Sequence, residues 1–336
     1  MTTHAAQAPI AVGVDVSKEE LVIAELFSDG TFTHRSLANT MAAAEHYVSG
    51  LAGRGFTGRI IVESTGHHQW PIVLAAADAG LDVRLLNPLQ AAARRQGRVR
   101  KTKNDRIDAE ILAEMAWTER KLPAPFVRSR AAIALRQQLQ LLAQLERSIQ
   151  QLQATLRAQR EAAERAGVAP PESLAGLEAS LEDLRAQRRT LQRESDALAR
   201  QLADRQIAQA FAHLPGITAD CAHMLASVLD PGAGRHGWVA YIGLDISVIQ
   251  SGKFEGRGKL TKRGMPYLRK RLYQAAWGAA MNTAAGRRYY DALRAGGRKH
   301  KEALVIIARK LLRAAHAVAQ NPDQPIDENR LFALPA

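Results

Sequence analysis

Four carboxylates stand where a folded chain could bring them together. Asp15 and Glu63 each end a short apolar run, and an acidic residue there is not explained by packing. At the carboxyl edge of a sheet, such a residue faces the crevice where ligands bind. Asp105 and Asp108 have the i,i+3 spacing that places both on one face of a helix. Alternatively, Asp105 alone caps the N-terminus of that helix. Together the four acids predict a hard-oxygen site for Mg²⁺, and two such ions could clamp the attacking and leaving oxygens of a phosphodiester.

A basic run precedes the second pair of acids. It consists of Arg94, Arg95, Arg98, Arg100, Lys101 and Lys103. The acids would repel DNA or RNA unless cations and basic residues offset their charge, so the run indicates a nucleic-acid contact. The alternative is a solvated, charged loop.

A serine in the last third stands beside glycines and basic residues. Ser251 follows Gln250 and precedes Gly252, in a segment where glycine allows close backbone approach and Lys or Arg can contact phosphate. The residues alone favour Ser251 as a phosphate ligand over Ser251 as a nucleophile, because no general base is found near it in the sequence. The basic residues predicted here to bind nucleic acid are Arg257, Lys259, Lys262, Arg263, Arg269 and Arg271.

A second phosphate-binding pattern lies upstream of this serine. Leu214–Thr218 followed by the apolar run Ala222–Leu229 resembles a helix-hairpin-helix, whose tight glycine turn presents backbone N–H groups to phosphate. Thr218 stands where a second glycine is usual. The alternative is a plain helical turn.

The elements that must position the acids lie in residues 1–130. Three strands are expected in succession, followed by helices that alternate with two more strands, which predicts a mixed sheet flanked by helices. The expected strands are Ile10–Val16, Glu20–Phe27, Thr31–Leu37, Arg59–Glu63 and Leu81–Leu86, and the expected helices lie near Thr40–Ala52, Trp70–Ala79, Pro88–Gln96 and Asp105–Thr118. This order is compatible with a ribonuclease-H-like α/β fold, although propensity alone does not single that fold out.

Residues 131–206 predict a coiled-coil arm. Leucines recur at alternating steps of three and four in two stretches, which Gly167–Pro171 separates. Arg188 and Ser195 occupy positions on the second seam and would weaken the pairing or set its register. The arm is expected either to fold back on itself or to pair with another subunit.

The charge is concentrated in residues 207–336. The chain of 336 residues carries a formal net charge of +13, of which +10 belongs to this predicted helical domain. Such a surface favours a polyanionic partner. The single cysteine, Cys221, excludes an internal disulfide. We expect a cytoplasmic protein, because the N-terminus lacks the pattern of a signal peptide and no apolar stretch suits a membrane span.

Taken together, these segments resemble one known family, the DEDD insertion-sequence transposases that act as bridge-RNA-guided recombinases. The resembling segments are Gly13–Lys18, Glu63–Gly66, Asn87-Pro88, Lys103–Ala109, Leu214–Ile217, Tyr241–Leu244, Gln250–Gly252, Thr261–Gly264 and Lys299–Leu312. The resemblance implies a RuvC-like N-terminal domain (1–130), a coiled-coil insertion (131–206) and a helical transposase domain (207–336). Met265 and Asp245-Ile246 depart from the family's usual residues.

The resemblance also implies residue roles and partners. It assigns metal binding and catalysis to Asp15, Glu63, Asp105 and Asp108, and it makes Ser251 the nucleophile. The implied partners are donor and target double-stranded DNA and a structured guide RNA, with dimers that assemble into a tetramer through the coiled coils. In such a tetramer, Ser251 of one subunit would meet the acids of another.

Two other classes of protein remain open at this point. A hydrolytic nuclease of the Holliday-junction-resolvase kind would need the four acids but not Ser251. A non-enzymatic nucleic-acid scaffold would need only the basic domain and the coiled coil.

Overall fold

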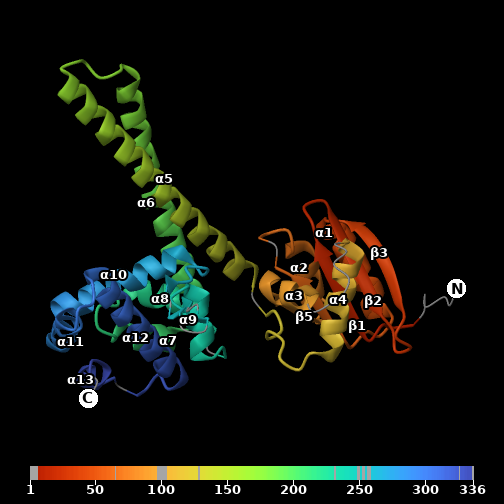
Figure 1. Ribbon diagram of the computed structural model, residues 1–336. Helices are drawn as coiled ribbons and strands as arrows, with labels where there is room; N and C mark the ends of the chain where they lie inside the picture. Colours follow the sequence, from red (N-terminus) through yellow and green to blue (C-terminus); the bar gives the residue numbers. More distant parts are fainter. Residues whose placement is uncertain are drawn as a thin grey trace. The chain divides into compact units, whose positions relative to one another are not determined.

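The chain forms two compact units in a computed structural model (Figure 1), Met1–Arg128 and Ser129–Ala336. The structure describes residues 7–64, 66–96, 104–127, 129–230, 232–247, 250–251, 254–255, 259–324 and 326–334. Each unit has its own buried cores, so each is described by itself.

The first unit is built on a five-stranded mixed sheet in the order β3-β2-β1-β4-β5. Its strands are β1 (Ala11–Val16), β2 (Glu20–Leu26), β3 (Phe32–Ala38), β4 (Arg59–Glu63) and β5 (Asp82–Leu86). The first three strands form an antiparallel meander, whereas β4 runs parallel to β1 and β5 runs parallel to β4. This topology is consistent with the expected ribonuclease-H-like fold.

Helices cover both faces of this sheet (Figure 1). Their bounds are α1 (Met41–Gly53), α2 (Trp70–Asp78), α3 (Pro88–Gln96) and α4 (Asp105–Thr118). Val12 and Val14 pack with residues of α1 and α2, whereas Ala11 and Ile61 pack with α4 on the opposite face. Successive side chains of a strand point to opposite faces, which explains why strands buried on both sides are apolar almost throughout. The predicted strands and helices of this unit are confirmed to within one residue at each end.

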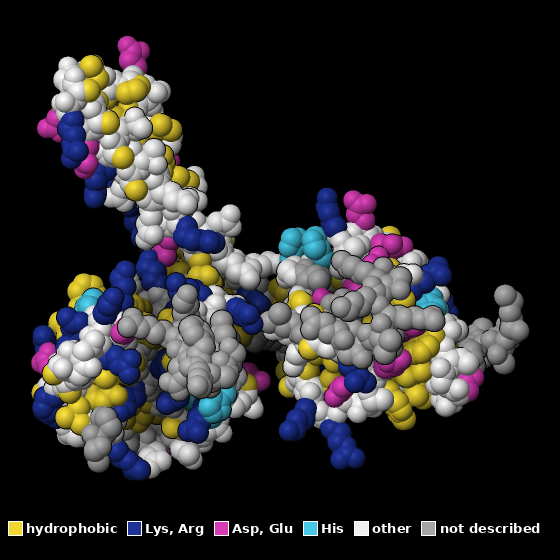
Figure 2. Space-filling view, viewed as in Figure 1, with side chains coloured by type: hydrophobic (Ala, Val, Ile, Leu, Met, Phe, Trp, Pro, Cys, Tyr) yellow, Lys and Arg dark blue, Asp and Glu magenta, His cyan; other side chains and the backbone are white. Residues whose placement is uncertain are grey.

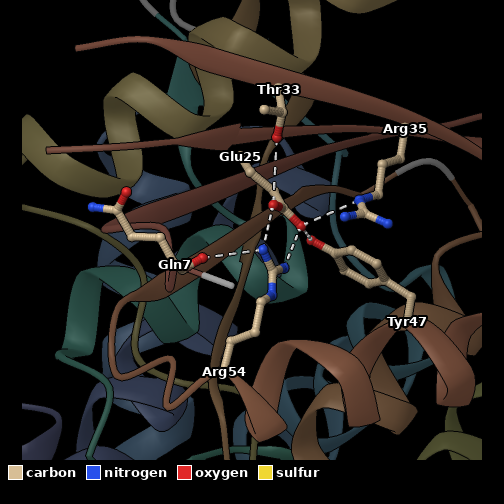
Figure 3. A network of polar contacts seen from close by, with 6 residues as sticks. All are labelled: Gln7, Glu25, Thr33, Arg35, Tyr47 and Arg54. Carbon is tan, nitrogen blue, oxygen red and sulfur yellow. Dashed lines mark hydrogen bonds and ion pairs between the residues drawn. The ribbon is translucent and has the colours of Figure 1, made fainter. Parts of the chain in front are cut away.

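A buried ion pair holds α1 to the sheet on the face opposite α4. Glu25 is fully buried, and Arg54 donates to both of its carboxylate oxygens, at 2.6 and 2.9 Å (Figure 3). Tyr47 Oη donates to the same carboxylate at 3.0 Å, and Arg54 also reaches the backbone oxygen of Gln7 at 3.3 Å. Burial alone would raise the pKa of Glu25, but Arg54, Tyr47 and the charge of Arg35 together lower it.

The second unit is helical, with four short strands. Two helices of the unit are long, α5 (Arg130–Ala166) and α6 (Ser173–Leu202). The remaining elements are α7 (Arg205–Ala212), α8 (Ala219–Val228), α9 (Arg235–Ile242), β6 (Ile246–Ser247), β7 (Gln250–Ser251), β8 (Phe254–Glu255), β9 (Lys259–Leu260), α10 (Pro266–Asn282), α11 (Ala284–Ala295), α12 (His300–Gln320) and α13 (Glu328–Leu331). One large core joins the short helices to the adjoining parts of α5 and α6.

The distal parts of α5 and α6 run side by side as an arm of this unit (Figure 1). Their leucine seams meet each other in a separate small core that includes Ile149, Leu156, Leu174 and Leu181. The helix α5 ends at Gly167, whose φ of +66° is readily adopted by glycine. Pairing within one chain therefore accounts for the inner seam, and association between chains stays a prediction.

None of the helices in the described ranges is both long enough and apolar enough to cross a membrane.

The Glu25 network predicts a large loss of stability on Glu25→Gln. The variant leaves the guanidinium of Arg54 without its counter-charge, which should lower the free energy of unfolding at neutral pH by about 3–5 kcal/mol. Because the folded pKa of Glu25 is lowered, its contribution is present above the unfolded pKa and is lost as pH falls through the folded value. Urea unfolding, with hydrogen exchange of β2 peptides to assign the transition, measures both effects.

Glu45→Gln on the exposed face of α1 is the matched control, and its effect should stay within about 0.5 kcal/mol. Equal stability of the Glu25 and Glu45 variants at neutral pH would contradict the assigned role of Glu25.

Candidate functional site

Two of the predicted acids lie side by side at the carboxyl edge of the sheet. In the parallel pairing of β1 with β4, Val14 is opposite Val62. Asp15 and Glu63 are the next residues of the two strands. Both point to the face covered by α4, because Gly13 and Ile61, two residues earlier, contact α4 or its core. Glu63 is buried and Asp15 is partly buried.

The other two acids lie in the first turn of α4. Asn104 is the N-cap and accepts a hydrogen bond from the backbone N–H of Arg106 at 3.1 Å. Asp105 is therefore the first helical residue and not the cap, so the capping interpretation of Asp105 is wrong. Asp108 follows at i+3 and is buried, whereas Asp105 is exposed.

Gly13 allows α4 to approach the sheet closely, which brings Asp105 and Asp108 near Asp15 and Glu63. A Cβ at this position would lie 2.1 Å from the backbone oxygen of Ala109 and 2.3 Å from the backbone nitrogen of Ala113. The backbones of β1 and α4 thus approach each other with no side chain between them. This approach sets the first turn of α4 beside the end of β1.

The four carboxylates are coupled electrostatically. The pKa of Asp15 is raised from 3.8 to about 6, first by burial and then by the charges of Asp105, Glu63 and Asp108. The backbone N–H of Val16 opposes this shift only in part. Like charges gathered in a partly buried crevice are the environment that a divalent cation stabilises, and oxygen donors suit a hard cation.

The carboxylates do not yet surround a common point. In the part of the chain that the structure describes, no three His, Cys, Asp or Glu side chains are close enough to hold one ion. The predicted placement of all four acids on one side of the sheet holds, whereas their convergence on one ion stays a prediction. That convergence requires the side chains to move toward one another.

Asn39 is a residue of this edge that the sequence reasoning missed. Its Nδ2 donates to the backbone oxygens of Ser17 at 2.8 Å and His68 at 2.9 Å. It therefore connects the loop after Asp15 with the loop after Glu63. An asparagine directly after a strand is typical of a turn, so no local signal indicates this bridging role.

Ser251 lies on a narrow hairpin of the second unit. It is the last residue of β7, and it pairs with Phe254 of β8 in antiparallel register. Farther from the turn, β6 pairs with β9, with Ile246 opposite Leu260. The backbone of Ser251 is described but the position of its side chain is not, and residues 252–253 lie outside the described ranges.

The base of this hairpin is built from two segments singled out in the sequence, Tyr241–Leu244 and Thr261–Gly264. A Cβ on Gly264 would lie 2.1 Å from the backbone oxygen of Tyr241, and Gly243 has a φ of +75°. Arg269 donates to the backbone oxygen of Ile242 at 3.0 Å and is partly buried. We call this region, residues 241–246 and 260–264, the hairpin base.

The predicted nucleic-acid contacts divide into four groups, one of which is Arg271, a partly buried residue of α10. Arg94, Lys262 and Arg263 are exposed. Arg269 binds the hairpin base, so its described contacts are internal. Residues Arg98, Arg100, Lys101, Lys103 and Arg257, and the side chains of Arg95 and Lys259, lie outside what the structure describes. Lys and Arg side chains are spread over the visible face of the short helices of the second unit (Figure 2).

The predicted helix-hairpin-helix corresponds to α7, a turn and α8. Thr218 caps α8 by accepting from the backbone N–H of Cys221 at 3.3 Å. Gly216 has a φ of +78°, and a Cβ there would lie 2.1 Å from the backbone oxygen of Ala275 in α10. The turn and α10 border a cavity of about 350 Å³ that Arg271 helps to line. Phosphate binding at this turn stays a prediction.

Comparison with known families covers most of the chain. Residues 12–159 match the model of DEDD transposases of the IS110 type, described as Transposase. Residues 208–291 match the model described as Transposase IS116/IS110/IS902 family. No curated protein matches the chain. The first match contains all four acids, and the second contains both the α7–α8 turn and the Ser251 hairpin.

The crowding of acids predicts that Asp15→Asn stabilises the protein in the absence of divalent cations. Because the folded pKa of Asp15 exceeds the unfolded one, the wild type loses stability as pH rises from about 4 through about 6. At neutral pH the variant should be more stable by about 1–2 kcal/mol, after allowance for solvent screening. Thermal unfolding in a chelator measures this difference, and at pH 4 the difference should vanish. A less stable variant at neutral pH would show that the carboxylates do not repel one another.

The close approach at Gly13 predicts that Gly13→Ala displaces α4. The added methyl group would overlap two backbone atoms, which flexible side chains cannot relieve, so unfolding should require about 1–3 kcal/mol less free energy. Gly50→Ala in α1 is the matched control, since its new methyl group meets nothing within 4 Å and should stabilise the helix by up to about 1 kcal/mol. Denaturant unfolding should therefore show changes in the free energy of unfolding of opposite sign for the two variants. Changes of the same sign would mean that the packing of α4 does not depend on Gly13.

Proposed function

The chain belongs to the DEDD-type insertion-sequence transposases, and from this premise we propose that it exchanges DNA strands through a serine nucleophile and a carboxylate-bound Mg²⁺ site under the guidance of a structured RNA. As a transposase, it is an enzyme that acts on DNA, and a DEDD domain suggests dependence on a divalent metal. The observation that carries the proposal is the coupling of four family-matched acids at one edge of the sheet.

The acids supply the proposed metal site. Asp15, Glu63, Asp105 and Asp108 would hold Mg²⁺, because all their donor atoms are carboxylate oxygens and their mutual repulsion favours a cation. When bound, Mg²⁺ polarises the scissile phosphate and lowers the pKa of a hydroxyl group near it. Asn39 would keep the loops after Asp15 and Glu63 in register while the acids bind.

Ser251 supplies the proposed nucleophile. Its Oγ would form a bond to phosphorus while the bond from phosphorus to the leaving strand breaks, and the leaving strand would depart as a hydroxyl with the serine proton. A hydroxyl of another strand end would then attack the phosphoserine linkage and return a proton to Oγ. Each step replaces one phosphoester by another, so no ATP is required.

The proposed active site is shared between subunits. The acids belong to the first unit and Ser251 belongs to the second, so a tetramer could bring the acids of one chain to the serine of another. Exposed apolar residues on α5, α6 and their connection support association through the arm. These residues are Leu141, Val168 and Leu177, with exposed fractions of 53%, 60% and 44%.

The RNA would provide sequence choice. In RNA-guided recognition, base pairing reads the target while the protein holds backbones by charge and shape. The concentration of positive charge in residues 207–336 supports such a backbone-binding role toward both DNA and RNA.

A mixing experiment tests the serine and the shared site together. Ser251→Ala and Asp15→Asn should each reduce recombination by on the order of 10⁴-fold or more, as does the loss of other catalytic groups that act as a unit. Mixed before RNA and DNA are added, the two variants should restore part of the activity, because some sites then combine an intact serine with intact acids. Product formation and covalent protein–DNA adducts, resolved on denaturing gels, are the measurements.

Ser247→Ala, in β6 of the same hairpin, is the control and should form adducts at the wild-type level. Wild-type rates from Ser251→Ala would remove the serine from the mechanism and favour hydrolysis. An inactive mixture of the two variants would instead favour a site within one chain.

A further inference from the structure

Two hydrogen bonds join Asp245 and Thr261 at the hairpin base, just before the strands that lead to Ser251. The backbone oxygen of Asp245 accepts from the N–H of Thr261 at 3.0 Å, and its carboxylate accepts from the Thr261 hydroxyl. The β6–β9 pairing starts at the next residue on each side. Asp245 is thus the carboxylate at the root of the hairpin.

Arg309 of α12 lies near this carboxylate, and Arg313 lies near Arg309. Arg309 lies near enough to Asp245 for their charges to interact, and Arg313 follows one helical turn later. Burial lowers the pKa of Arg309, the charge of Arg313 lowers it further, and Asp245 opposes both. Burial and the positive charge of Arg313 thus outweigh the effect of the Asp245 carboxylate on Arg309.

Arg309 also has an unused donor. Its Nε is buried and has no hydrogen-bond partner among the residues that the structure describes. Asp245 and Arg309 form no ion pair, and the Asp245 carboxylate is bound to Thr261. A buried, unpaired donor on a charged group is costly, and an incoming anion would remove that cost.

Two further positive residues follow Thr261 in the sequence. Lys262 and Arg263 directly follow Thr261 and are exposed. Lys262 has a φ of +54°, a left-handed conformation that is unfavourable for a residue with a side chain. Two separate elements, α12 and the loop after Thr261, thus place positive residues at the hairpin base.

We propose that Arg309 and Arg313, together with Lys262 and Arg263, bind a backbone phosphate of the nucleic-acid strand that is presented to the Ser251 hairpin. Four residues lie between Ile246 and Ser251, so even a fully extended chain keeps the hairpin base within about 20 Å of the serine. At about 3.4 Å of rise per nucleotide, the bound phosphate belongs to a nucleotide within about six positions of the reacting one. Arg309 is thus a positioning residue, and its relation to the reaction rests on the proposed function of Ser251.

The key variant is Arg309→Met, which keeps most of the aliphatic volume and removes the charge. In the absence of nucleic acid it should leave the unfolding temperature unchanged or raise it, because it replaces a partly buried, unpaired charge by an apolar group. A structural role for Arg309 predicts the opposite, a loss of stability.

Binding to a fluorescein-labelled DNA duplex of random sequence, followed by anisotropy at several salt concentrations, measures the phosphate contact. Arg309→Met and Arg313→Met should each weaken binding severalfold and reduce the slope of log Kd against log salt by about 0.9. Arg309→Lys should keep the slope. Arg287→Met, at an exposed arginine of α11, is the matched control and should leave the affinity and the salt slope unchanged.

Two outcomes would overturn the inference: an unchanged slope for Arg309→Met, or a lowered unfolding temperature for that variant alone. Adduct formation by Arg309→Met separates this inference from the proposed function. The adduct yield should fall at low DNA concentration and recover at saturation, since a positioning residue acts on binding. If Ser251→Ala recombines normally while Arg309→Met binds weakly, the proposed function fails and the phosphate site stands.

Discussion

The approach of α4 to β1 is the constraint on which the acidic edge depends. Two backbones meet at Gly13 with no side chain between them, and this contact fixes how far along β1 the first turn of α4 begins. Asp15 lies two residues beyond the contact, on the same face. A side chain at Gly13 would push the helix away and separate Asp105 and Asp108 from Asp15 and Glu63. The electrostatic coupling that raises the pKa of Asp15 is thus a consequence of packing.

The edge is assembled at the expense of local stability. Three acids raise the pKa of Asp15 within a partly buried crevice, and among the described residues no positive group contributes to that shift. On the opposite face of the sheet, Glu25 and Arg54 form a bidentate ion pair that stabilises the unit. Tyr47 donates a further hydrogen bond to Glu25. One face of the sheet therefore carries an excess of negative charge that suits a cation. The other face carries a paired positive and negative charge that stabilises the fold.

The second unit uses glycine in the same way. Gly264 lies against the end of α9, and Gly216 lies against α10, each where a Cβ would overlap backbone atoms. The first contact forms the base of the Ser251 hairpin, and the second fixes the turn between α7 and α8. Both glycines occur in segments that resemble the transposase family, and both are explained by close packing before any contact with phosphate is considered. These two glycines thus shape the backbone of the segments in which they occur.

The amino-acid sequence was sufficient to predict the strands and helices of the first unit, because apolar runs, turn residues and an N-terminal cap act over a few residues. It also singled out Asp15 and Glu63, because acids at the ends of apolar strands stand out locally, and Asp105 and Asp108, because their spacing places them on one face of a helix. The folded structure was needed to show that Asn104 and not Asp105 caps α4, that Arg269 binds the hairpin base, and that Asn39 bridges two loops. It likewise brought Arg309 to Asp245, 64 positions apart in the sequence. Such contacts depend on how separate elements pack, and no local pattern of residue types encodes that packing.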